Sequence, residues 1–198
     1  MSSFLGPIHF WLYNKIQLQE ALVTRLATCA EEYGWGKKLV KQYGNPESRP
    51  LEDLIDVNNI HGWLQSRIQD VESRYAQLVT SLIKEDATRM ESIRRIVYEF
   101  GAEHAIDADT ELSMVIKKLE DSLLSGMPCD HVNVLKEEDE QHVSWEEVAD
   151  IHGDYWKAAD GDPAKYYDLK QEMIAGLLSE TPYKLVVPQM HQYKVQAI

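Results

Sequence analysis

The sequence predicts a mainly α fold, a helical bundle built on a duplicated αα-hairpin, with a small β-hairpin in the C-terminal third. Three observations predict this class. Apolar residues recur at helical spacing before Gly126, two stretches in the first hundred residues match each other, and β-branched and polar residues alternate after Pro128. We expect residues 1–127 to form the bundle, and residues 128–198 to form the hairpin and a C-terminal helix packed on the same domain.

The helical predictions rest on apolar residues three or four positions apart and on the Gly and Pro residues that end most of these runs. Pro7 favours a helix start, because its fixed φ suits a first turn in which its missing N–H is not needed. The expected helices run from Ile8 to near Gly34, over about 37–43, from Leu51 to Leu82, over about 87–100 and over about 110–124. None of these runs is apolar enough to cross a bilayer.

An internal repeat organises the first hundred residues. A shift of 52 residues places His61 on His9, and nine of the 21 positions from 8 to 28 are identical to their counterparts. A second block, 94–101, matches 37–44 at an offset of 57. Two αα-hairpins, about 8–44 and 60–101, should therefore pack on each other about a pseudo-twofold axis, since neither buries its apolar face alone.

The chain changes character after Pro128. Residues 131–145 read as a β-hairpin, with alternating β-branched and polar residues on either side of an acidic turn at 136–140. Helices are expected over about 145–156 and 163–178. The tail at 183–187 either adds a strand or remains free.

The repeated histidines are the first candidate site. His9 and His61 both fall at the edge of the apolar stripe of their helices, where imidazoles from facing helices can hold a metal. Glu20 and Glu72 share that edge but lie about 16 Å further along the axis, so an antiparallel partner would be needed to bring Glu72 near His9. The cofactor would be a transition metal, Fe or Zn, or haem. The candidate metal ligands are His9, His61, Glu20, Glu72, Glu99, Glu103 and His104. The alternative is that these histidines cap helices or pack in the core.

A second group of candidates follows the helical region: Cys129, His131, His142 and His152. Cys with His can hold zinc or supply a thiolate nucleophile beside a base. The spacing matches no standard zinc signature, so a buried structural Cys is the alternative. The aromatic residues around His152 either line a pocket or belong to the core.

Composition restricts the partners. The formal charge of −13 repels phosphate backbones and anionic lipid, so we expect no nucleic acid and no membrane as partner. The two cysteines, a hundred residues apart, fit reduced thiols, and the N-terminus lacks a signal peptide, so we expect a cytoplasmic protein. A homo-oligomer is an open alternative, and a protein partner is not specified by the sequence.

Three functions are therefore weighed. The first is a metal- or haem-binding bundle with inward-facing histidines. The second is a structural or protein-interaction bundle with no bound cofactor. The third is a small-molecule enzyme that uses the Cys129, His131 and His152 region. Phosphate-binding loops, dinucleotide-binding glycine motifs and the nucleophile elbow of serine hydrolases do not occur.

Overall fold

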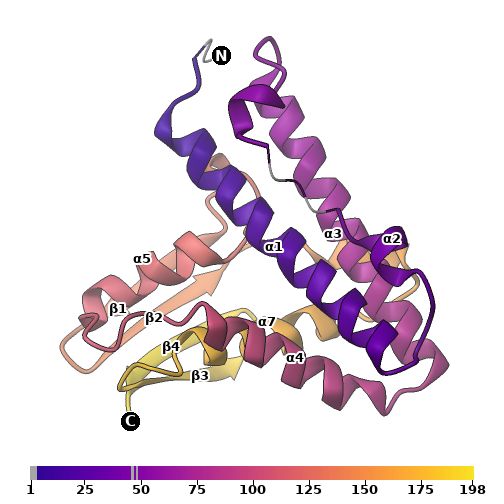
Figure 1. Cartoon of the computed structure of the whole chain (residues 1–198). Coiled ribbons are helices and arrows are strands. Elements are labelled where there is room, and N and C mark those ends of the chain that lie inside the picture. The colour runs from indigo at the N-terminus through magenta and orange to yellow at the C-terminus, as the bar shows by residue number, and fades with distance from the viewer. Residues whose placement is uncertain (1–3, 46, 48) are drawn as a thin grey trace.

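The computed structural model describes residues 4–45, 47 and 49–198 and confirms a mainly helical chain (Figure 1). The N-terminal part consists of α1 (Pro7–Glu32), α2 (Leu39–Tyr43), the short 3₁₀ turn η1 (Leu51–Asp53), α3 (Ile60–Glu85), α4 (Arg89–Glu103) and α5 (Leu112–Ser122). The C-terminal part consists of the turn η2 (Pro128–Asp130), β1 (Asn133–Glu138), β2 (His142–Glu147), α6 (Gly153–Ala158), α7 (Ala164–Leu177), β3 (Tyr183–Gln189) and β4 (Gln192–Ala197).

The two longest helices, α1 and α3, lie side by side and run in the same direction (Figure 1). The His9 and His61 rings meet near their N-terminal ends, and Glu20 pairs with Arg74 about three turns further on. The antiparallel arrangement considered from the sequence is therefore wrong. The reason is that α3 starts beside the end at which α1 began, so both helices run the same way.

The second helices of the two predicted hairpins differ. Both α1 and α3 have 26 residues, but α2 has five residues and α4 has 15. A duplicated αα-hairpin is not shown by this arrangement, and the duplication stays a prediction from the sequence.

The predicted helix from Leu51 is interrupted. Leu51 opens a single 3₁₀ turn, and α3 begins only at Ile60. Asn59 sets this start, because its side-chain oxygen accepts a hydrogen bond from the Gly62 N–H (3.3 Å) and so satisfies a free donor of the first turn.

The helices α4 and α7 pack closely against each other through two glycines, Gly101 and Gly176. A Cβ on Gly101 would lie 2.6 Å from the carbonyl oxygen of Met173 and 3.1 Å from the Cα of Gly176. Backbone atoms cannot yield as a flexible side chain can, so only glycine fits at this crossing. This contact fixes α7 against the helical part of the molecule.

The predicted β-hairpin is one half of a four-stranded antiparallel sheet in the described chain, with strand order β1-β2-β4-β3. The tail supplies the other half, β3 and β4. The helix expected over 145–156 is wrong in its first part, because β2 continues to Glu147 and α6 begins at Gly153. Along β2 and β4 buried side chains alternate with more exposed ones, as expected for a sheet with one covered face.

One apolar core includes residues of both the helical and the C-terminal segment, for example Leu12, Leu64, Trp156 and Val195. The division at residue 127 stays a prediction. No helix in the described part of the chain combines the length and the apolar character needed to cross a membrane.

Candidate functional site

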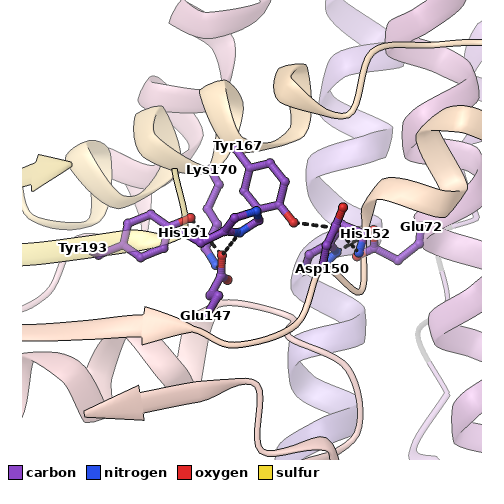
Figure 2. Close-up of polar contacts among 8 residues, drawn as sticks. All are labelled: Glu72, Glu147, Asp150, His152, Tyr167, Lys170, His191 and Tyr193. Carbon is purple, nitrogen blue, oxygen red and sulfur yellow. Dashed lines mark hydrogen bonds and ion pairs between the residues drawn. The ribbon is translucent and has the colours of Figure 1, made fainter. Parts of the chain in front are cut away.

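A buried carboxylate–imidazole pair joins α3 to the segment before α6 (Figure 2). The Nδ1 atom of His152 lies 3.1 Å from Oε2 of Glu72, and the two side chains are 2% and 1% exposed. The residues are 80 positions apart in the sequence, so the tertiary fold alone brings them together. Burial of two ionisable groups is costly unless each has a partner, and here each is the other's partner.

The imidazole of His152 is held on two further sides. Its ring stacks on Tyr166 with 3.8 Å between centroids and an 18° angle between planes. The main chain is fixed by Asp150, whose Oδ1 accepts hydrogen bonds from the N–H groups of His152 (3.2 Å) and Gly153 (2.7 Å). The ring therefore has one orientation, which is what a histidine used in binding or proton transfer requires.

Each member of the pair retains one buried atom with no protein partner among the described residues: Oε1 of Glu72 and Nε2 of His152. An ionised carboxylate can only accept, so we assign the imidazole proton to Nδ1, which donates to Glu72. Nε2 then carries a lone pair. Both remaining atoms are hydrogen-bond acceptors, and each requires a donor from outside the protein.

A cavity of about 360 Å³ is lined by this pair. Ile68, Glu72 and His152 are its buried residues, whereas Asp130 and Asp154 are exposed at its rim. None of the described residues that line it is Lys or Arg. The cavity therefore combines acceptors at its base with negative charge at its entrance.

A second buried network fastens the sheet to α7. The ammonium of Lys170 on α7 forms an ion pair with Glu147 on β2, and both side chains are at most 3% exposed. Glu147 also accepts a hydrogen bond from the Tyr193 hydroxyl (2.9 Å) and lies 3.4 Å from Nδ1 of His191. Burial alone would raise the pKa of Glu147, but the Lys170 ammonium, the nearby His152 and the hydrogen bond from Tyr193 outweigh it and lower that pKa.

Tyr167 connects the two networks, and Figure 2 shows it between them. Its hydroxyl donates to Oδ1 of Asp150 (2.6 Å), and its ring packs edge-on against His191 with 4.4 Å between centroids. Burial opposes ionisation of Asp150, but the hydrogen bonds from Tyr167 and two backbone N–H groups prevail and lower its pKa. Burial and the neighbouring Asp150 raise the pKa of Tyr167, so the hydroxyl stays a donor.

The repeated histidines do meet, but in unequal environments. The His9 and His61 ring centroids are 5.6 Å apart. His9 is 6% exposed, and its Nδ1 accepts a hydrogen bond from the Gly6 N–H (2.9 Å) at the start of α1. His61 is exposed; it is the second residue of α3, which Asn59 caps, whereas His9 is the third residue of α1. The expectation of equivalent positions is wrong, since the helix starts are capped by different residues.

The remaining predicted metal ligands are dispersed. Within the described residues, no group of three or more His, Cys, Asp or Glu side chains is placed to hold a metal ion. Each of these predicted ligands contacts a different group: Glu20 contacts Arg74, Glu72 contacts His152, Glu99 contacts Arg95, Glu103 contacts Arg25, and His104 contacts the carbonyl oxygen of Phe100.

The second candidate group is also separated. Cys129 and His131 are exposed, and neither lines the cavity of His152. His142 lies at the β1–β2 turn, 3.1 Å from both Glu137 and Asp139. Of the four, only His152 belongs to the buried site.

Sequence reasoning named Glu72 and His152 separately, and it missed Glu147, Asp150, Tyr167, Lys170, His191 and Tyr193. One signal was present. In β2, Glu147 follows Val143 and Trp145 at every second residue and so faces the core with them. A carboxylate in that register requires a buried cation, and Lys170 supplies it.

Comparison with protein-family models, with curated proteins and with solved structures finds no match. The geometry of the site is therefore the basis for the functional argument.

Proposed function

We propose that this chain binds a small molecule carrying a protonated amine in the cavity of Glu72 and His152, and that His152 accepts a proton from it. The observation that carries the proposal is the pair of buried acceptors, Oε1 of Glu72 and Nε2 of His152, that have no protein partner in the described chain. A donor-rich cation satisfies both. An unsatisfied buried polar atom costs about 1–3 kcal/mol, which a ligand recovers at each atom.

The charged residues that line the cavity favour a cationic ligand over an anionic one. Four carboxylates line the cavity, those of Glu72, Asp130, Asp150 and Asp154, without any Lys or Arg among its described lining residues. The apolar walls, Ile68 and Ile151, suit an aliphatic body. An alkylammonium or alkylguanidinium ion combines both features.

The imidazole gives the site its chemical capacity. With Nδ1 directed to Glu72, the carboxylate stabilises an imidazolium formed when Nε2 takes a proton. Proton transfer from a bound ammonium converts it to a neutral, nucleophilic amine. Of the three residues in the enzyme hypothesis, this role therefore retains His152. It does not use Cys129 or His131, which lie outside this cavity.

Binding of n-butylammonium and n-butylguanidinium, measured by isothermal titration calorimetry, tests the proposal, with butyrate as an anion of similar length. Glu72→Gln keeps the side-chain volume and removes the charge, so we expect affinity to fall about tenfold, the equivalent of one charge-assisted hydrogen bond. Glu91→Gln on exposed α4 surface is the matched control and should bind normally.

Absence of binding by both cations at millimolar concentration would overturn the proposal. Equal affinity of the Glu72→Gln variant and the unaltered chain would place the ligand elsewhere. Circular dichroism of each variant separates lost binding from lost folding.

The metal hypothesis keeps one favourable observation. Two imidazoles on one tetrahedral zinc have ring centroids about 5 Å apart, close to the 5.6 Å between His9 and His61. The hydrogen bond from Gly6 opposes it, because it occupies the Nδ1 lone pair of His9 and leaves the proton on Nε2. This hypothesis is tested by the zinc content of the unaltered chain and of His61→Ala after dialysis against Zn²⁺. Equal zinc content in the two proteins would end the metal hypothesis. An absorption spectrum tests haem in the same samples.

A duplication origin for α1 and α3 is likewise proposed. Each carries a cation over an indole one turn away, with Lys15 4.0 Å from the Trp11 ring centroid and Arg67 5.6 Å from that of Trp63. Homologous sequences tested at the same 52-residue offset should keep identity above chance, and identity at chance level would contradict it. Cytoplasmic location and the absence of a nucleic-acid partner stay predictions from composition.

A further inference from the structure

Lys15 is a buried lysine whose ammonium forms no ion pair among the described residues. It lies on α1 and is 4% exposed. No hydrogen bond of its ammonium is present within the described residues either, and Nζ lies 4.0 Å from the centroid of the Trp11 ring. Lysines are almost never buried this far unless they are paired. The group therefore differs from Lys170, which is equally buried but bound to Glu147.

The side chain lines a cavity of about 230 Å³ between the start of α1 and the segment before β1. This cavity is separate from that of His152, although Gly126 borders both. Its apolar walls include Trp11, Met127 and Val132, and Glu120 is the carboxylate among its described lining residues.

The electrostatics shift Lys15 towards its neutral form, although the ammonium still predominates near neutral pH. Burial lowers the pKa of Lys15 to about 8; Glu120 and Asp121 oppose this change, and Lys170 adds to it. At about pH 7.5 roughly a quarter of such amines are unprotonated, against about a thousandth for a lysine with its ordinary pKa. A desolvated lysine near a second cation is a known way to activate an amine nucleophile.

We propose that Lys15 is the reactive amine of a second site, which takes a small aldehyde or ketone with an apolar body as an imine. The Nζ lone pair attacks the carbonyl carbon, a C–N bond forms, and the carbonyl oxygen takes up a proton to give a carbinolamine. Loss of that hydroxyl as water, with release of the second amine proton, gives the imine. One water is produced for each imine, and no oxidant or reductant is needed.

Glu120 is placed to assist the dehydration, because it lines the same cavity and its carboxylate can accept a proton from the attacking amine and return it to the departing hydroxyl. The Trp11 ring is held in place by its Nε1–H, which donates to Asp121 (2.7 Å). Its face offers an apolar surface beside the amine for the body of the carbonyl compound.

Reductive trapping tests the proposal. The folded chain is treated briefly with butanal and sodium cyanoborohydride at a series of pH values on either side of 8, and each lysine's butylation is measured by peptide mass spectrometry. We expect Lys15 to be labelled at least tenfold faster than exposed Lys37 and Lys117, with a pH midpoint near 8. The buried but paired Lys170 should stay unlabelled and serves as the matched control.

Two variants complete the test. Lys15→Arg keeps the charge and should remove the fast-labelled site alone, and Glu120→Gln should move the pH midpoint of Lys15 labelling to a lower pH, because the Glu120 carboxylate opposes the lowering of that pKa. Labelling of Lys15 no faster than that of exposed lysines, or with a midpoint near 10, would overturn the proposal. These outcomes are independent of amine binding at His152, because the two cavities are tested with different probes.

Discussion

The buried ion pair between Glu147 and Lys170 gives the most quantitative prediction. Replacement of Lys170 by Met keeps an unbranched side chain of similar length but leaves the Glu147 carboxylate buried without its cation. Removal of one partner from a buried pair costs about 3–5 kcal/mol. Glu147 would retain its hydrogen bond from Tyr193 (2.9 Å) and the nearby His191 (3.4 Å), so we expect the lower end, about 3 kcal/mol.

Lys165→Met is the control on the same helix. Lys165 faces Asp168 at 3.4 Å, and these two side chains are 33% and 31% exposed. A solvated pair of this kind contributes about 0–1 kcal/mol. The double variant Lys170→Met with Glu147→Gln removes the unpaired charge and keeps an acceptor for Tyr193. It should therefore recover at least half of the loss.

Equilibrium unfolding in urea, followed by far-UV circular dichroism, measures these free energies. A loss of about 3 kcal/mol lowers the midpoint by about 1 M or more at the slopes usual for small proteins. The reasoning fails if Lys170→Met costs no more than Lys165→Met, or if the double variant is no more stable than Lys170→Met.

Three further predictions follow from the same contacts. The folded-state pKa of Glu147 is depressed, so its contribution to stability is present above the unfolded pKa near 4.3 and is lost as pH falls through the folded pKa. The free energy of unfolding should therefore drop more steeply below about pH 4 in the unaltered chain than in Glu147→Gln. His9→Ala should cost about 0.5–2 kcal/mol through loss of its cap bond and His61→Ala under 0.5 kcal/mol, and equal losses in urea unfolding would contradict this assignment. Gly101→Ala should lower stability by about 2 kcal/mol, because a methyl group 2.6 Å from the Met173 carbonyl outweighs the helix propensity gained; thermal unfolding at or above the natural midpoint would refute it.

The helices were the predictable part of this fold. Apolar spacing and end signals predicted a helix from Ile8 to near Gly34 and another over 163–178, and the structure has α1 and α7 there. The break before Ile60 was missed because apolar residues recur at helical spacing from Leu51 onward, although α3 starts only after its N-cap, Asn59. The spacing of apolar residues indicates which side chains are buried, whereas the start of a helix depends on a single capping side chain.

The second β-hairpin was harder to predict for two reasons. Pro188 argues against a strand, yet β3 is an edge strand whose pairing with β4 shifts between Val186 and Gln189, where a missing N–H is tolerated. The turn into β4 contains His191 at a positive φ of 67°, in place of the Gly or Asn that normally marks such a turn.

The site depends on long-range packing that local patterns do not contain. Glu72 could be placed on a helix face, but its partner His152 is 80 residues away on a different element. The repeat also suggested matched histidines, whereas the caps of α1 and α3 make His9 buried and His61 exposed. A pattern of residue types predicts which side chains point inward, and only the packing decides which of them meet.

The central claim, that Glu72 and His152 form a ligand site, is tested most directly by ¹⁵N NMR of the His152 imidazole. We expect the imidazole proton on Nδ1 and a lone pair on Nε2, and the Nε2 resonance should move on addition of n-butylammonium in the unaltered chain but not in Glu72→Gln. A proton on Nε2 in the free protein, or an Nε2 resonance that does not respond to the cation, would contradict a ligand site at Glu72 and His152.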